Sequence, residues 1–298
     1  MFLVWAEIAM QENSEISALF TLIDDPDEEV FSTVSNRIVN YGTEIIPRLE
    51  NLWENTVSEP VQERIEMLIH RLQFTDLTTQ VRQWNNQPDK SLLIGALNIA
   101  RYQYPDLHIG PAIQEIEKIK RNVWLELNNF LTPLEQANVI SSIVYNYYNL
   151  KGSEISYTNP DDFFIHKVIE TKKGNTLSNG ILYLILAEML ALPVKAINIP
   201  RQFVLAFFNT DYHPETYNGN PQRKIHFYID ATTGQVFTHK DVDAYFKRVA
   251  VPPTPFYFKP MKNERVIQVL IEELSRCFET DELLYKKMEL LDLARLLD

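Results

Sequence analysis

Residues Lys172–Val194, KKGNTLSNGILYLILAEMLALPV, read as a glycine-bearing turn, a polar helix start and a long apolar helix that ends before a proline. Helix N-termini favour nucleophiles and bound anions, because unpaired backbone N–H groups and the macrodipole stabilise negative charge there. The polar side chains at this helix start are Asn175, Thr176, Ser178 and Asn179. The stretch therefore predicts either an active-site helix or a scaffold that has lost its nucleophile.

Downstream of this helix the pattern changes from helical to strand-like. VKAINI (194–199), QFVLAFF (202–208) and RKIHFYIDATTGQVF (223–237) are rich in β-branched and aromatic residues, and glycine-bearing turns lie in the same region. This composition predicts a small antiparallel sheet. Val251–Pro260 is proline-rich and extended, and Asn263–Asp298 returns to a helical pattern.

Upstream, Ser14 to about Phe130 shows helical periodicity with short polar breaks. The first helix carries Leu19, Leu22 and Ile23 on one face. A DDPD break follows, and its Pro26 is predicted in the first turn of the next helix, which Gly42 stops.

A third helix is expected from Pro47. A further helix begins near Leu131, with Thr132 as N-cap, Pro133 at the first position and Glu135 completing a capping box.

The segment LIDDPDEEVFSTVSNRIVNYGTEIIPRLENLW (22–53) resembles HEAT-like helical repeats, in which an Asp-Pro turn precedes a helix and a glycine closes the unit. Stacked repeats need about three units for an independent core. The later helices do not align at one period, so an irregular helical bundle remains the alternative.

Composition narrows the classes of function. The 298 residues are 45% hydrophobic and 23% charged, which predicts a chain that folds throughout, in two domains or one domain with a helical extension. The net charge of −12 repels phosphates, and the one basic run, Lys118, Lys120 and Arg121, is interleaved with glutamates. We therefore predict no nucleic-acid binding.

Metal and cofactor signals are absent from the sequence. Cys277 is the only cysteine, the six histidines are scattered, and the eight glycines form no phosphate-binding cluster. The start MFLVWAEIAM lacks a basic signal-peptide region, and no apolar run reaches the length of about 18 residues that a membrane span needs. We predict a cytoplasmic protein with no cofactor, no metal and no membrane association.

The order of these segments, together with NIPRQFVLAFF and FYIDATTG, resembles the transglutaminase-like superfamily, most closely its SirB-type branch. The resemblance is strongest over Leu131–Lys247. It implies an α+β protein with an N-terminal α-helical (HEAT-like) region over 1–130, a papain-like transglutaminase core with a small antiparallel sheet over 131–250, and C-terminal helices over 251–298.

Catalytic members of that superfamily use a Cys, a His and an Asp for acyl transfer, and the resemblance carries these positions onto Thr176, Gln202 and Asp230. Glutamine has no nitrogen that titrates near neutral pH, so Gln202 cannot act as a general base. The Thr176 hydroxyl needs a base to become a nucleophile. The family's triad is therefore predicted to be degenerate at two of three positions.

Two other residues, His226 and Cys277, could in principle replace the missing catalytic groups. His226 lies on the same strand as Asp230, but residues four apart along a strand are separated by roughly 13 Å, too far for a direct hydrogen bond. Thr176 or Ser178 then reads as a helix cap and His226 as an ordinary strand histidine. Cys277 sits on the apolar face of a helix, which predicts a buried, unreactive thiol.

The sequence thus predicts a non-catalytic binding or regulatory scaffold with a protein partner. Its binding cleft would comprise Asn175, Thr176, Ser178, Gln202 and Asp230. The alternative is a hydrolase or acyltransferase with a remodelled hydroxyl site, and a third possibility is a helical adaptor in which the cleft plays no part. The sequence leaves the oligomeric state open.

Overall fold

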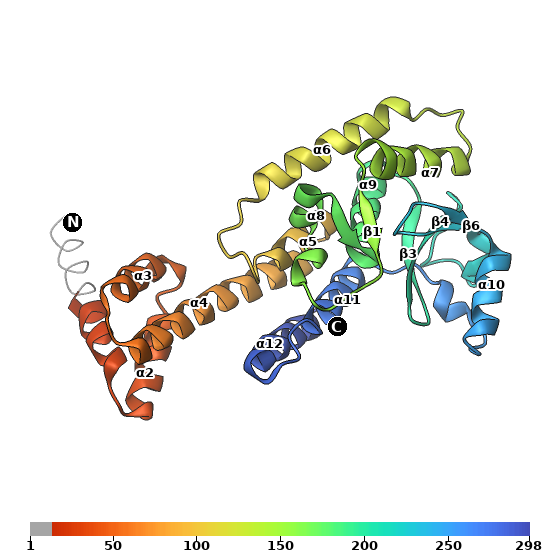
Figure 1. The fold of residues 1–298 in the computed structure, drawn as a ribbon. Helices are drawn as coiled ribbons and strands as arrows, with labels where there is room; N and C mark the ends of the chain where they lie inside the picture. Colours follow the sequence, from red (N-terminus) through yellow and green to blue (C-terminus); the bar gives the residue numbers. More distant parts are fainter. Residues whose placement is uncertain (1–13) are drawn as a thin grey trace. The chain divides into compact units, whose positions relative to one another are not determined.

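The computed structural model describes residues 14–298, so the segment MFLVWAEIAM, read above as no signal peptide, lies outside the described residues. The chain divides into two compact units, Met1–Gln80 and Val81–Asp298 (Figure 1). We call them the N-terminal and the C-terminal unit. The domains expected at 1–130, 131–250 and 251–298 stay a prediction.

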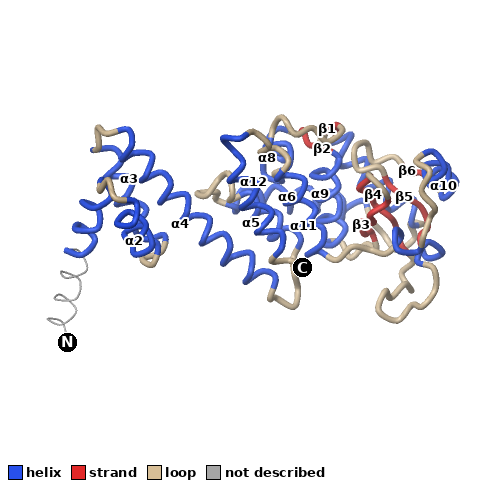
Figure 2. The backbone as a smooth tube through the Cα atoms, turned by 90° about the horizontal axis from the view of Figure 1, so that it is seen from below, coloured by secondary structure: helices blue, strands red, loops and turns tan. Residues whose placement is uncertain are grey.

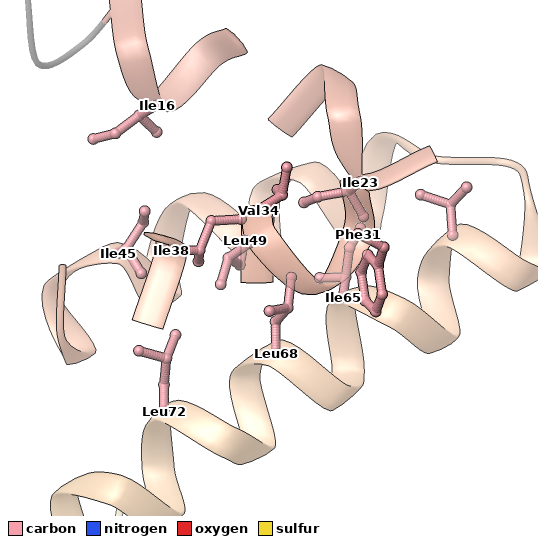
Figure 3. Packing of buried hydrophobic residues seen from close by; sticks show 11 residues of the cluster. Ile16, Ile23, Phe31, Val34, Ile38, Ile45, Leu49, Ile65, Leu68 and Leu72 are labelled. Carbon is pink, nitrogen blue, oxygen red and sulfur yellow. The ribbon is translucent and has the colours of Figure 1, made fainter. Parts of the chain in front are cut away.

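The N-terminal unit is helical. After the helical residues 14–21, its elements are η1 (Leu22–Asp24), α2 (Glu28–Val39), η2 (Thr43–Ile45), α3 (Ile46–Asn55) and the first part of α4 (Glu59–Asn85). Each element contributes apolar side chains to one core, as Figure 3 shows, and those of α2 and α4 recur at helical spacing. The core residues are Ile16, Ile23, Phe31, Val34, Ile38, Ile45, Leu49, Val61, Ile65, Leu68 and Leu72.

Two local predictions for this unit are wrong. The Asp27 side chain caps α2 by accepting a hydrogen bond from the Glu29 N–H at 2.8 Å, so Pro26 precedes the cap instead of standing in the first turn. Leu22 is 40% exposed while Ile23 is fully buried, so the two do not share the apolar face. The predicted start of the third helix is confirmed, with Pro47 in the first turn of α3.

The C-terminal unit mixes helices and short strands. Its elements after α4 are α5 (Leu92–Ala100), α6 (Ile109–Glu126), α7 (Pro133–Ser141), the π-helix η3 (Ser142–Tyr147), β1 (Lys151–Ser153), η4 (Pro160–Phe163), α8 (Ile165–Thr171), β2 (Lys173–Asn175), α9 (Thr176–Met189), β3 (Val194–Ile199), β4 (Gln202–Phe208), η5 (Pro221–Lys224), β5 (Ile225–Ile229), β6 (Val236–Phe237), α10 (His239–Arg248), η6 (Pro255–Phe258), α11 (Asn263–Ser275), η7 (Asp281–Leu283) and α12 (Leu284–Arg295).

The main sheet is antiparallel, with its strands in chain order β3-β4-β5-β6 (Figure 2). Val204, Ala206 and Phe208 of β4 pack in one core with Val242 and Phe246 of α10. Because side chains alternate along a strand, Leu205 and Phe207 face the other way, and α9 contacts β3 and β4. Because both faces of β4 are buried, its sequence is apolar without interruption from residue 203 to residue 208.

Helix α9 is enclosed by its neighbours, and every residue from Leu177 to Ala187 is buried. Gly180 makes this packing possible, because a Cβ there would lie 2.7 Å from the Phe203 ring of β4. The mixed α+β class is confirmed. The predicted capping box of Thr132 and Glu135 is also present at the start of α7.

A second, parallel pairing joins β1 to β2, directly before α9. No pattern in the sequence predicts this pairing. Across residues 14–298, no helix combines the length and apolar character that a membrane span requires.

Candidate functional site

The N-terminus of α9 is organised by Asn175. Its side-chain oxygen accepts hydrogen bonds from the N–H groups of Leu177 at 3.0 Å and Ser178 at 2.9 Å. The Ser178 hydroxyl oxygen accepts from the Asn175 N–H at 3.0 Å and donates to the Asp162 carbonyl at 2.6 Å. The cap is therefore Asn175, with Ser178 as its reciprocal partner, and the prediction that Thr176 or Ser178 caps the helix is corrected.

Both capping residues are only 1% exposed and lie beneath the surface of the helix start. Asn179 is also buried, and its side-chain amide donates to the Lys151 carbonyl at 3.4 Å, which joins α9 to β1. Asn175 and Ser178 were predicted to line a binding cleft. In the structure both side chains are buried and stabilise the start of α9 by capping it.

A cleft of about 920 Å³ opens beside this helix start. Its walls come from the first residues of α9, from the main sheet at the β3–β4 turn, from the loop after β1 and from the end of α11. The lining residues are Glu154, Ile155, Tyr157, Thr176, Leu177, Asn198, Arg201, Gln202, Phe203, Val204, Ile229, Asp230, Thr232, Gln235, Val236, Phe237, Val269, Glu273 and Arg276. Thr176, Gln202 and Asp230 thus line one cleft.

Thr176 meets hydroxyl and carbonyl groups but no base. Its hydroxyl donates to the Ser153 carbonyl at 3.2 Å, and its oxygen lies 3.1 Å from the Thr232 hydroxyl oxygen. Since the single Thr176 hydrogen points at the carbonyl, the Thr232 hydroxyl donates to Thr176. The hydroxyl pair is held without any group that could take a proton near neutral pH.

Asp230 uses both carboxylate oxygens to shape the β5–β6 turn. One accepts from the Thr232 N–H at 2.8 Å and the other from the Thr233 hydroxyl at 2.7 Å. The backbone closes the same turn, because the Gly234 N–H donates to the Asp230 carbonyl at 2.7 Å with Gly234 at φ +74°. The carboxylate therefore positions Thr232 against Thr176.

Gln202 is the exposed first residue of β4 and pairs with Ile199 across a two-residue turn. His226 is exposed on β5, where its ring lies 6.2 Å from the Phe207 ring, and it is not among the residues that line the cleft. No imidazole therefore accompanies the Thr176 hydroxyl in the cleft.

Cys277 was expected on the apolar face of the terminal helix, but it follows the end of α11 and is only half-buried. Burial, together with the nearby carboxylates of Asp162 and Glu273, raises the pKa of the Cys277 thiol to about 12. The thiol is protonated at neutral pH and also stands outside the set of residues lining the cleft.

Another part of the cleft lining is held by a polar network that no sequence pattern predicts. The Tyr157 hydroxyl donates to the Glu273 carboxylate at 2.6 Å, and the Arg276 guanidinium donates to the Tyr157 oxygen at 2.7 Å. Burial and then the Glu273 hydrogen bond raise the pKa of Tyr157 to about 12. No local sequence signal predicts a contact between residues more than a hundred positions apart.

The cleft offers polar groups that can bind a polar ligand. The primary amides of Asn198, Gln202 and Gln235 and the cation of Arg201 face the same space. Over the described part of the chain, no three His, Cys, Asp or Glu side chains gather as a metal would require.

The family model described as "Transglutaminase-like superfamily" matches residues 111–272, which is more than half of the chain. The human protein named "F-box only protein 21" is 24% identical over 46% of this chain and 26% of its own length. "Protein SirB1" of Salmonella typhimurium is 24% identical over 41% of this chain and 45% of its own length.

A "UPF0162 protein" of Xylella fastidiosa is 25% identical over 41% of this chain and 45% of its own length. The chain thus spans less than half the length of each of these relatives. No solved structure matches. Because the family model covers most of the C-terminal unit and the cleft lies within that unit, the chain belongs to the transglutaminase-like superfamily, and the relatives place it in the SirB-type branch.

Proposed function

We propose that this protein is a non-catalytic member of its superfamily that binds a segment of a protein partner in the cleft beside α9. The observation that carries the proposal is the content of the cleft: Thr176, Gln202 and Asp230 line it together, and no imidazole or thiol accompanies them. Acyl transfer by the family's route needs a thiolate nucleophile and a proton-shuttling ring.

The loss of both the thiol and the imidazole should lower the rate of acyl transfer by a large factor. Removal of one member of such a triad lowers kcat by about four to six orders of magnitude in the hydrolases where it has been measured. Asp230 offers no compensation, since its two carboxylate oxygens are engaged by Thr232 and Thr233. The cleft is therefore better suited to hold a ligand than to transform one.

The rest of the chain completes the proposal. The net charge of −12 favours a protein partner over a nucleic acid, and the single cysteine suits a reducing, cytoplasmic setting. We propose that the C-terminal unit contains a papain-like transglutaminase core and that the N-terminal helices form a HEAT-like region with a further surface for the partner. In this role the protein would regulate its partner by occupancy of the cleft.

The remodelled-enzyme alternative has one observation in its favour, because Thr176 does present a hydroxyl in the cleft at the start of α9. The purified chain is incubated with an amine donor and a peptide glutamine, and separately with a fluorophosphonate and a thiol-directed probe. We expect no turnover and no stoichiometric label. Labelling that maps to Thr176 would establish the enzyme and overturn the proposal.

The binding half of the proposal is tested by filling the cleft. Thr176→Trp should abolish partner recovery in affinity capture from the native cell, while Met67→Asp, on the exposed surface of α4 in the N-terminal unit, should at most weaken it, because the cleft supplies the main contact. The opposite pattern would support a helical adaptor in which the cleft plays no part.

A further inference from the structure

Arg201 occupies an unusual backbone position at the edge of the cleft. Pro200 and Arg201 form the two-residue turn between β3 and β4, since Ile199 pairs directly with Gln202. Arg201 has φ +61°, in the left-handed region that such a turn normally fills with glycine or asparagine. An arginine there costs stability, because its Cβ crowds the backbone.

The other non-glycine residues with positive φ in the described chain have a structural explanation. Asn149, Lys172, Ala191 and Ala250 each follow the end of a helix, where a left-handed residue satisfies the last carbonyls. Arg201 differs from all four in standing at the tip of a hairpin and in lining the cleft. Backbone strain of this kind concentrates at ligand sites.

The Arg201 side chain makes no contact that would offset the strain. It is exposed, and within residues 14–298 no hydrogen bond, ion pair or ring contact engages its guanidinium. Arg276, the second arginine of the cleft, is by contrast tied to Tyr157 and Glu273. Arg201 is therefore the uncommitted cation among the cleft's described residues.

The turn that carries this cation is fixed in place. The Tyr245 hydroxyl of α10 donates to the Pro200 carbonyl at 2.6 Å, and Pro200 itself has a restricted φ. The guanidinium thus projects from a held backbone. The guanidinium is a planar, permanently charged fork that matches a carboxylate through two parallel hydrogen bonds, and the held turn keeps its stem at the edge of the cleft.

The remaining polar groups of the cleft suit a peptide. The side-chain amides of Asn198, Gln202 and Gln235 each supply donors and an acceptor, which is the complement of a peptide backbone. The cleft's volume of about 920 Å³ accommodates several residues. Two of its three carboxylates, those of Asp230 and Glu273, are occupied by hydrogen bonds within the chain.

Building on the cleft-binding role proposed above, we propose that Arg201 determines the specificity of the cleft by pairing with an aspartate or glutamate side chain of an acidic peptide segment. The amides of the cleft hold the backbone of that segment on either side of the acidic residue. The strained arginine is explained by this contact, which a glycine in the same turn could not make.

The probes for the test are pools of short fluorescent peptides, blocked at both ends and degenerate except for a central Glu, Gln or Lys. A fourth pool has a central Gln and a free C-terminal carboxylate. Binding to the full chain is measured by fluorescence polarisation. The Glu pool should bind about tenfold more tightly than the Gln pool, in line with a charge-assisted hydrogen bond, and the Lys pool least tightly.

Three variants separate recognition from folding. Arg201→Gly keeps the left-handed turn, so it should unfold at the same or a higher temperature while the Glu pool falls to the affinity of the Gln pool. Arg201→Lys should keep part of the preference. Arg121→Gln, which removes an exposed cation of α6 outside the cleft, should keep all of it.

Each contrary outcome is informative. Equal binding of the Glu and Gln pools, or a preference that survives Arg201→Gly, overturns the role of Arg201 while leaving the cleft as a binding site. Preference for the free C-terminal pool overturns the assignment to an acidic side chain. If Thr176→Trp leaves the binding of every pool unchanged, both this inference and the proposed function fail.

Discussion

The hydroxyl oxygens of Thr176 and Thr232 lie 3.1 Å apart at the start of α9. Neither hydroxyl can remove a proton from the other near neutral pH, so the pair does not by itself supply a nucleophile and its base. Asp230 fixes Thr232 in this position through the Thr232 N–H. In the proposed non-catalytic role, this hydroxyl pair stands at the helix start where a catalytic site would need a nucleophile and a base.

Restoring the missing groups should restore reactivity in two separable steps. In a Cys277→Ser background, Thr176→Cys should be alkylated by iodoacetamide with a pH midpoint at or below that of an ordinary cysteine, about 8.5. Adding Gln202→His should lower the midpoint by about one unit or more, because an imidazolium stabilises the thiolate. Alkylation rate against pH measures both.

The unaltered chain is the control for this experiment. Its own thiol, Cys277, should react slowly across the neutral range because its pKa is raised to about 12. Identical pH profiles for the single and the double variant would show that residue 202 does not face residue 176, and would contradict the degenerate-triad interpretation.

Substitutions of Ser178 and of Thr176 should have different effects, because Ser178 stabilises the fold and Thr176 lines the cleft. Ser178→Ala removes the hydroxyl that bonds the Asn175 N–H and the Asp162 carbonyl, so one buried and one partly buried backbone group lose their partner. The free energy of unfolding should fall by about 1–3 kcal/mol. Thr176→Ala, at a half-buried position, should cost about 1 kcal/mol or less.

Urea denaturation of the full chain, followed by circular dichroism, gives both values. The same variants should rank in the opposite order for ligand binding, since Thr176 lines the cleft and Ser178 does not. A Thr176→Ala variant that is less stable than Ser178→Ala would contradict this division.

The parts of the fold that the sequence predicted correctly have local signals. The strands β3 and β4 match two apolar runs, of which the first begins after Pro193 and the second begins after the turn at Pro200. The Thr132 capping box follows from one short sequence motif. The assignment of Thr176, Gln202 and Asp230 to one site came from the family resemblance and not from periodicity.

The parts that were missed depend on tertiary contacts. The strands β1 and β2 contain three residues each and exist only because they pair with each other. The choice of Asn175 as cap could not be made locally, since Asn, Thr and Ser all favour that position. Arg201 had one usable signal, a proline at the first position of a two-residue turn, which is compatible with the type II turn whose second residue has a positive φ.

Ala191 offers a stabilising substitution. It has φ +54° directly after the C-cap of α9, where the Cβ of an alanine is strained and glycine is not. Ala191→Gly should raise the free energy of unfolding by up to about 1 kcal/mol, once the greater flexibility of glycine in the unfolded chain is deducted.

Ala187→Gly is the matched control, because it places the same substitution inside α9 at a fully buried position. There the loss of helix propensity and packing should lower stability by about 1 kcal/mol or more. Thermal unfolding of the two variants should move in opposite directions, and a parallel loss would refute the strain at Ala191.

His166 should make the stability of the chain depend on pH. Both of its ring nitrogens are buried without a hydrogen-bond partner, and its ring lies 4.9 Å from the Tyr104 ring and 6.0 Å from the Phe164 ring. Burial, followed by the charge of Lys167, lowers the pKa of His166, and the carboxylates of Asp161 and Glu170 oppose that shift only in part.

The sign follows from the unfolded chain, where a histidine has a pKa of about 6.5. As the pH falls below that value, the unfolded chain takes up a proton before the folded chain does. The stability that His166 contributes is therefore present above pH 6.5 or so and is lost as the pH falls through the lower pKa of the folded state.

His166→Phe preserves the ring packing and removes the titrating group, so it should lose less stability than the unaltered chain between pH 7.5 and pH 5.5. Urea denaturation at the two pH values measures the difference, and His226→Phe, at an exposed position, should behave like the unaltered chain. An equal loss of stability on acidification in His166→Phe and in the unaltered chain would contradict this prediction. It would mean that the buried imidazole is protonated without a cost in stability, and that its ring N–H has a hydrogen-bond acceptor.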